Sequence, residues 1–374
     1  MSLFTTPTNS QGRDRLPRRL RVGWTLVLVA AAAIVAFSFL PTPYVIQQPG
    51  PVFDTLGTVE IDDKEVPLID IDAETYPTDG SLDMLTVSVV GSRETRPNWF
   101  SVAQAWFDSS KAVLPLDSMY PQGVTLEQSR EESRIEMENS QHDAVAAALR
   151  QLGYDVPTTL TIATVEEGYP AEGLLEVGDQ IVTVNGESFA DVASMREELA
   201  DNGTESPATI EVVRDGEAKT FEVTPVPSEL TGVPIVGVAV QVSYELPVDV
   251  TIRLDKVGGP SAGLMFALGI YDKLTPGDET GGESIAGTGT ITGTGEVGAI
   301  GGVRQKMYGA LKAGADWMLV PASNCADVAG NEPDGLSVFA VATLAEALTA
   351  LEGISGGSTD DLQTCDAVAA AAAR

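Results

Sequence analysis

The sequence predicts a mixed α/β (α+β) protein that contains a separate strand-rich domain and follows a single N-terminal transmembrane helix. Three observations support this organisation. From residue 260 onward, patterns typical of helices and strands alternate along the chain. Residues 154–230 instead hold short strands in which apolar and polar residues alternate. Residues 22–40 carry no charge and are mostly apolar.

The N-terminus combines a basic arm, residues 1–21, with the apolar stretch 22–40. At ~1.5 Å per helical residue, the stretch roughly crosses a ~30 Å hydrocarbon core. A cleaved signal peptide is the alternative, but Phe37, Phe39 and Leu40 end the stretch where such a peptide needs small residues. The arginines of the arm are expected to stay in the cytoplasm. The sequence therefore favours a single-pass protein of the cell membrane, held in the lipid bilayer with residues 41–374 outside.

Composition and motif absences exclude several classes of function. Asp and Glu total 54 against 22 Lys and Arg, giving a net charge of -32, and so acidic a chain is not expected to bind nucleic acid. No Gly-Lys pair occurs, so a P-loop for ATP is absent from the sequence. The chain has one histidine and no close group of Cys or carboxylate residues spaced as metal ligands, which argues against a zinc hydrolase. No cofactor is predicted.

Residues 41–153 contain fewer clear elements. A Pro-rich region leads to a strand at 84–90 (MLTVSVV), which is rich in branched side chains. A later helix ends at Gly153 and places Met137, Ala144 and Val145 on one face.

The strand-rich domain, residues 154–230, contains the strand patterns LTIATV, IVTVNG, TIEVVR and FEVTPV, and one helix at 192–202. Residues 231–353 supply further strands and then the α/β alternation. Residues 354–374 are predicted to be a flexible acidic tail. Cys325 and Cys365 are expected to form a disulfide outside the membrane, although the tail cysteine could instead pair between chains.

A candidate nucleophile lies at the start of a predicted helix. Pro260 suits the first helical position, and Ser261 is then expected in the first turn, beside unpaired N–H groups at the positive end of the helix dipole. Such a serine needs a base. The single histidine, His142, lies in a charged helical segment, whereas Lys306 lies in an apolar helix where desolvation would lower its pKa.

At these residues the chain resembles the Lon proteolytic domain, a Ser-Lys peptidase of the S16 type. The resemblance covers GPSAG at 259–263, IAGTGTITGTGEVGAIGGVRQKMYGALKAGAD at 285–316 and MLVPASN at 318–324. It implies that Ser261 is the nucleophile, Lys306 the general base, and Thr288 a hydroxyl that positions the amine. It also implies an oxyanion hole that includes the Ser261 N–H, and a homo-oligomer, specifically a hexamer. Gly258 departs from the pattern, because family members often have an acidic residue there.

Residues 154–229 resemble a PDZ domain of the bacterial protease-associated kind. This resemblance implies that a peptide adds as a strand beside a helix, with the edge formed by Thr161, Ile162, Ala163, Thr164 and Val165. Because Lon-like domains need strands and a helix before the serine motif, the PDZ domain is predicted to be inserted in the peptidase. Residues 41–153 and 231–353 would then be its N-terminal and catalytic parts. Anchor, PDZ domain and Lon-like domain together resemble a group of Gram-positive membrane proteases.

Three functions are consistent with these features. The first is an ATP-independent, membrane-anchored serine endopeptidase that cleaves extracytoplasmic proteins or peptides, with the PDZ domain binding or gating the substrate. The second is a non-catalytic PDZ scaffold on a degenerate Lon fold, which would need neither Ser261 nor Lys306. The third is an acyl hydrolase that uses the same dyad on esters.

Overall fold

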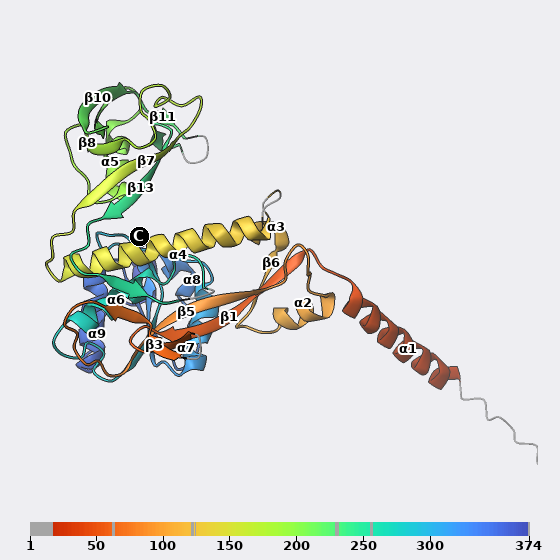
Figure 1. Ribbon diagram of the computed structural model, residues 1–374. Coiled ribbons are helices and arrows are strands. Elements are labelled where there is room, and N and C mark those ends of the chain that lie inside the picture. The colour runs from red at the N-terminus through yellow and green to blue at the C-terminus, as the bar shows by residue number, and fades with distance from the viewer. Residues whose placement is uncertain are drawn as a thin grey trace, which may run out of the picture. The chain divides into compact units, whose positions relative to one another are not determined.

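A computed structural model describes residues 18–61, 64–120, 123, 125–228, 232–254 and 257–372, without the side chains of 18–21, 30, 33–36, 38 and 39. The chain divides into two compact units (Figure 1). The first contains residues 1–47 and 89–122, and the second contains residues 48–88 and 123–374. The predicted basic arm lies outside the described residues as far as residue 17.

A mixed sheet forms the centre of the second unit. Its order is β19-β18-β15-β5-β1, followed by β6 of the first unit. Strands β5, β15, β18 and β19 are parallel neighbours. Long apolar runs in these strands are typical of parallel strands covered on both faces. The strands are β1 (Tyr44–Asp54), β5 (Ser81–Val90), β15 (Ser284–Gly287), β18 (Trp317–Pro321) and β19 (Ser337–Val341).

Side chains that alternate along these strands build two separate cores. On β18, Leu319 belongs to one core, whereas Met318 and Val320 belong to the other. The first core contains residues of α4 (Leu126–Gln151), α6 (Gly263–Leu274) and α9 (Leu344–Ser355). The second contains residues of α7 (Val303–Ala313), α8 (Cys325–Val328) and α10 (Cys365–Ala372). Helices therefore cover both faces of the sheet, as the α/β alternation predicts.

Short ladders and turns complete this domain. β4 pairs with β14, which brings the chain back after the inserted segment. The remaining elements are β2 (Thr58–Ile61), β3 (Lys64–Pro67), β4 (Ile69–Ile71), β14 (Val250–Ile252), β16 (Thr290–Ile291), β17 (Val297–Gly298) and the 3-10 turn Ala322–Asn324.

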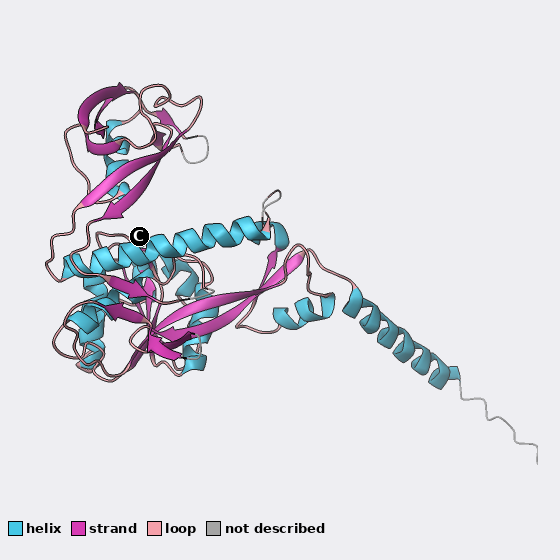
Figure 2. Cartoon of the chain, viewed as in Figure 1, coloured by secondary structure: helices cyan, strands magenta, loops and turns pink. Residues whose placement is uncertain are grey.

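A second domain, residues 154–244, interrupts the sheet domain between α4 and β14. Its five strands run in the order β10-β9-β8-β7-β13, and one helix packs with them (Figure 2). Asp215 (φ 54°) and Gly216 form a tight turn between β9 and β10. The elements are β7 (Thr158–Val165), β8 (Gln180–Val184), α5 (Val192–Asn202), β9 (Ala208–Arg214), β10 (Glu217–Val223), β11 (Val226–Pro227), β12 (Pro234–Ile235) and β13 (Val238–Tyr244).

The insertion has a later boundary than the sequence predicts. Strand β5, before the insertion, pairs with β15, after it, so one sheet is built from both sides of the inserted domain. However, residues 238–244 pair with β7 and belong to the inserted domain, not to the catalytic part that was predicted to resume at residue 231. The pattern of β13 is that of a strand in either domain, and only its tertiary partner decides between them.

Residues 354–372, the described part of the predicted tail 354–374, do not form the flexible tail that their composition predicts. Cys365 forms a disulfide with Cys325 at a Cα–Cα distance of 4.7 Å and is 1% exposed. Gln363 accepts a hydrogen bond from Ala340 N at 2.7 Å. The Ala-rich residues that follow form α10, because alanine has the highest helix propensity.

The first unit is small and contains α1 (Arg18–Phe39), α2 (Trp99–Trp106), β6 (Ala112–Pro115) and α3 (Leu116–Met119). β6 pairs with Tyr44–Gln47 of β1. Ile46, Val102 and Ala105 form its buried cluster. Within the described part of the chain, no helix combines the length and the apolarity that crossing a membrane requires.

Candidate active site

Ser261 lies in a tight turn that leads into α6. The helix begins at Gly263, so Ser261 precedes the helix and is not inside its first turn as predicted. The Gly263 N–H donates to the Pro260 carbonyl at 3.3 Å, which closes the turn before the helix starts. A side chain at Gly263 would displace its neighbours, because a Cβ there would lie 2.7 Å from Ser140 Oγ and 2.9 Å from Ile291 Cγ2.

Helix α4 holds this turn in place. Ser140 Oγ donates to the Pro260 carbonyl at 2.9 Å, and the Gly259 N–H donates to the Ser133 carbonyl at 2.8 Å. Ser140 is 3% exposed. The sequence analysis missed this role, because a serine that shares a helix face with apolar residues such as Met137 and Ala144 is common and gives little signal.

Lys306, the fourth residue of α7, contacts Ser261. Its Nζ lies 2.7 Å from Ser261 Oγ and 2.8 Å from Thr288 Oγ1. The side chain is 1% exposed, and this burial lowers the pKa of Lys306 from 10.5 to about 7. Lys306, not His142, is the ionisable residue that contacts the serine.

Thr288 orients the lysine amine. Its hydroxyl donates to the Ser261 carbonyl at 2.9 Å, so towards Lys306 it acts as an acceptor. A neutral amine that donates one proton to Thr288 can direct its lone pair at the Ser261 hydroxyl. The Gly289 N–H also donates to the Ser261 carbonyl, at 3.0 Å. The structure thus brings together the three residues that the sequence singles out.

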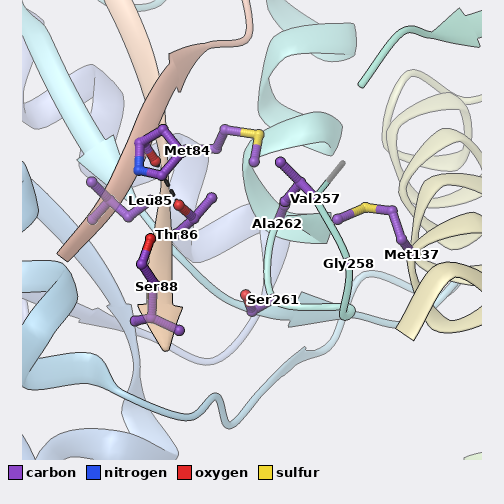
Figure 3. A pocket seen from close by; sticks show the side chains of 11 residues that line it. Met84, Leu85, Thr86, Ser88, Met137, Val257, Gly258, Ser261 and Ala262 are labelled. Atoms are coloured by element: carbon purple, nitrogen blue, oxygen red, sulfur yellow. Dashed lines mark hydrogen bonds between the residues drawn. The ribbon is translucent and has the colours of Figure 1, made fainter. Parts of the chain in front are cut away.

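A cavity of about 270 Å³ opens beside the nucleophile (Figure 3). Residues Met84–Ser88 of β5 form one wall, and Met137 of α4 and Val257 contribute apolar side chains. β15 pairs with β5 only over Ser81–Met84. The wall from Leu85 to Ser88 therefore continues past the end of β15, where an extended chain can approach it.

The strand predicted to receive a peptide, Thr161–Val165, is not at the edge of its sheet. β7 pairs with β8 on one side and with β13 on the other, where partners run from Val165↔Val238 to Thr158↔Tyr244. The pairing with β8 covers only Leu160 and Thr161, but β13 covers the whole of the other side, so a peptide cannot add to β7 on that side. The outer strand is β13, and α5 contacts β12, just before it. The missed signal is the run PIVGVAV at 234–240, a glycine turn that leads into an alternating strand.

Both ends of the inserted domain are fixed to the sheet domain. Arg150 donates to the Gly293 carbonyl at 2.6 Å and to Thr158 Oγ1 at 2.6 Å, and its guanidinium lies over the Tyr244 ring. Tyr244 donates to Asp143 at 2.6 Å. Burial, together with the charge of Asp143, raises the pKa of Tyr244, which therefore stays protonated as a donor.

Comparison with protein families confirms both resemblances. Residues 254–351 match the profile of the Lon protease (S16) C-terminal proteolytic domain, and residues 123–224 match that of the PDZ domain. The second match includes α4, although this helix packs in the core of the sheet domain. The sheet domain thus carries a peptidase domain of the Lon type, and the inserted domain is a PDZ domain.

Individual relatives match only in part. The Lon protease of Fusobacterium nucleatum is 45% identical over 69 residues, 18% of this chain and 9% of that protein. Lon protease 2 of Herpetosiphon aurantiacus is 36% identical over 108 residues, 27% of this chain and 13% of that protein. The chain thus spans about a tenth of these relatives. A solved PDZ domain of the SdrC-like protein from Listeria innocua is 19% identical, covering 22% of this chain and 93% of that chain, with a TM-score of 0.21.

Proposed function

We propose that this chain, which carries a serine peptidase domain of the Lon type and a PDZ domain, is an ATP-independent, membrane-anchored endopeptidase that cleaves extracytoplasmic proteins or peptides. The observation that carries the proposal is the buried contact of 2.7 Å between Lys306 Nζ and Ser261 Oγ. A scaffold has no use for a lysine held neutral against a serine hydroxyl.

The chemistry follows from the three side chains. The lone pair of Lys306 takes the proton of Ser261 as Oγ attacks the scissile carbonyl. The ammonium then gives this proton to the departing amine, which leaves an ester on Ser261. A water molecule, deprotonated by the same amine, hydrolyses the ester and restores the serine. The Ser261 N–H, just before α6, would stabilise the oxyanion.

The cavity suggests how a substrate is held. An extended segment would lie along Leu85–Ser88 of β5, which continues beyond β15. One side chain, next to the bond that is cut, would then enter the pocket lined by Met84, Met137 and Val257. The substrate preferred at this position is an apolar residue, since none of the described residues that line the pocket is charged.

The PDZ domain would bind a peptide at β13, not at β7. The backbone of β13 forms the outer edge of the five-stranded sheet, and a peptide could extend the sheet there beside α5. Hydrogen exchange with a synthetic peptide that ends in apolar residues and a free carboxylate tests this assignment. Protection should appear at β13, and protection confined to β10, the other outer strand, would contradict it.

Two features support an anchor and an extracytoplasmic location. The first is the uncharged stretch 22–40 that follows five arginines. The second is the buried disulfide between Cys325 and Cys365, because such bonds persist in oxidising compartments.

The decisive experiment compares wild-type with Ser261→Ala chains. Membranes from cells that express either chain are analysed by mass spectrometry for peptides released from extracytoplasmic proteins. Cleavage products should appear only with the wild-type chain. Equal products from both chains would refute the peptidase assignment, and turnover of esters without any cleaved protein would favour the acyl hydrolase.

A further inference from the structure

Helix α2, in the first unit, presents an exposed aromatic face. Phe100 and Trp106 are 57% and 59% exposed, and Phe107, at the end of the helix, is 93% exposed. Phe100 and Phe107 are seven positions apart, so they lie on the same side of the helix. Val102 and Ala105 turn the other way, into the small core of the unit. The aromatic face is therefore left over after folding, and is not a part of the core.

This face also lacks charge. Residues 97–107 contain no Asp, Glu, Lys or Arg, although a fifth of the whole chain is charged. Scattered apolar residues on a surface need no explanation, but neighbouring large ones indicate a contact surface. An uncharged surface in a chain of net charge -32 suits an apolar contact partner better than a charged one.

Hydrogen bonds tie the start of α2 to the residues that directly follow the apolar stretch 22–40. Pro41 forms an isolated β-bridge with Asn98, the residue that caps α2. The Thr42 N–H and the Thr42 hydroxyl each donate to the Pro97 carbonyl at 3.0 Å. The helix thus begins where the proposed anchor leaves the bilayer, and this contact is the reason to name lipid as the partner.

A group of Tyr and Trp side chains lies at the same place. Tyr44 makes edge-on contacts with Trp99 and Trp106, at ring-centroid distances of 6.1 and 6.4 Å. Tyr and Trp are enriched at both water–lipid interfaces of membrane proteins, because each ring is apolar with one polar group. Tyr44, the centre of this cluster, lies only four residues after Leu40, the end of the apolar stretch.

We propose that α2 is an interfacial membrane helix, whose residues Phe100, Trp106 and Phe107 enter the outer leaflet beside the anchor. The proposal rests on the anchor in the proposed function, and it adds a second, monotopic contact with lipid. A helix of this kind is expected to sit ~5–10 Å into the boundary between headgroups and acyl chains.

The test uses the full chain with Trp24→Phe, because Trp24 lies in the proposed anchor. This chain is reconstituted in phosphatidylcholine vesicles whose acyl chains carry bromine either near the headgroup or near the methyl end. Bromine quenches tryptophan on contact. Headgroup-proximal bromine should quench the emission of Trp99 and Trp106 more strongly than bromine near the chain end, and a further Trp106→Phe change should remove a large part of that quenching.

Substitution of the exposed aromatic face gives the matched comparison. Phe107→Asp should reduce the quenching, whereas Val177→Asp, at a 67% exposed position of the PDZ domain, should leave it unchanged. Equal quenching in both variants would overturn the proposal, because Phe107 would then not contact lipid. If brominated lipid does not quench the tryptophan emission, and the emission shifts to the blue as protein concentration rises, the aromatic face binds a second copy of the chain. That result would also overturn the proposal.

Alkaline carbonate extraction separates this inference from the proposed function. A chain that resists extraction but shows no quenching keeps its anchor, and only the interfacial helix is then wrong. If carbonate extracts the chain but headgroup-proximal bromine quenches its tryptophan emission before extraction, the anchor is refuted and the interfacial helix is supported. If carbonate extracts the chain and its tryptophan emission is not quenched, both the anchor and the interfacial helix are refuted.

Discussion

Burial of Lys306 should destabilise the fold in a way that depends on pH. Its pKa falls from 10.5 to about 7 in the folded chain. At ~1.4 kcal/mol per pKa unit, keeping the amine charged in the folded state costs roughly 5 kcal/mol relative to the unfolded state. Between these two pKa values the unfolded chain binds one proton more than the folded chain. Stability therefore rises with pH in this window, and below pH ~7 the full cost is present.

Replacing Lys306 by methionine should remove this dependence. Lys306→Met lacks the charge but fills a similar apolar volume, so the variant should be more stable than wild type near pH 7. The advantage is offset by the loss of two hydrogen bonds, worth about 1 kcal/mol each. The stability advantage of the variant should fall steadily as pH rises from about 7 and should reverse before about pH 10.5, because wild type regains the whole cost of roughly 5 kcal/mol over this range.

Chemical unfolding at several pH values measures this difference directly. Taking the difference between the two chains cancels every other titrating group that both share. Ser261→Ala is the control, because it removes the catalytic hydroxyl and keeps the buried amine, so it should follow wild type. A difference between wild type and Lys306→Met that stays constant across this pH range would refute the claim that burial holds the amine neutral.

Other predictions concern the same site and its supports. Lys306→Arg should be inactive in cleavage assays, because a guanidinium stays protonated and cannot act as a base, and the rate of the wild-type chain should fall as pH drops below about 7, the pKa of Lys306. Thr288→Val should lower kcat while leaving KM nearly unchanged, because the hydroxyl contacts Lys306 and lies outside the lining of the pocket. Arg150→Met should lower the free energy of unfolding by roughly 2–4 kcal/mol through lost hydrogen bonds. Cys365→Ser should cost roughly 3–4 kcal/mol for a loop of 40 residues, and unchanged unfolding curves would contradict either of the last two.

The sequence predicted the elements of this chain better than their partners. The alternation of apolar residues in β13 marks a strand, but nothing local says whether Val238–Tyr244 pairs with the PDZ domain or with the peptidase sheet. The error at β7 has the same origin, since the strand pattern that begins after residue 231 was recognised but was assigned to the peptidase and not to the edge of β7. Pairing between distant segments depends on tertiary contacts, and these leave no periodic signal.

The catalytic residues were predictable mainly because the motifs around them resemble the Lon proteolytic domain. A serine at a helix start is common and is weak evidence alone, and the resemblance is what assigned roles to Ser261, Lys306 and Thr288. Ser140 was not found, because a helix-surface serine is common and its contact with the Pro260 carbonyl appears only in three dimensions. Residues 89–122 were counted with the N-terminal part of the peptidase, whereas they belong to the first compact unit, because their elements are short and form a small core of their own.

The disulfide lies in the same core layer as the helix that carries the catalytic lysine. Cys325 and Cys365 belong to the core cluster that also contains Val303 and Met307 of α7, the helix that carries Lys306. A buried, deprotonated lysine requires that water be excluded along the whole side chain, and α7 alone cannot do this. Helices α8 and α10 contact one another, and α8 packs on α7, so the covalent bond joins the two helices of the layer that packs against the Lys306 helix. If the chain lies outside the cytoplasm, as proposed above, an oxidising environment would keep this disulfide closed and so stabilise the core layer beneath the Lys306 helix.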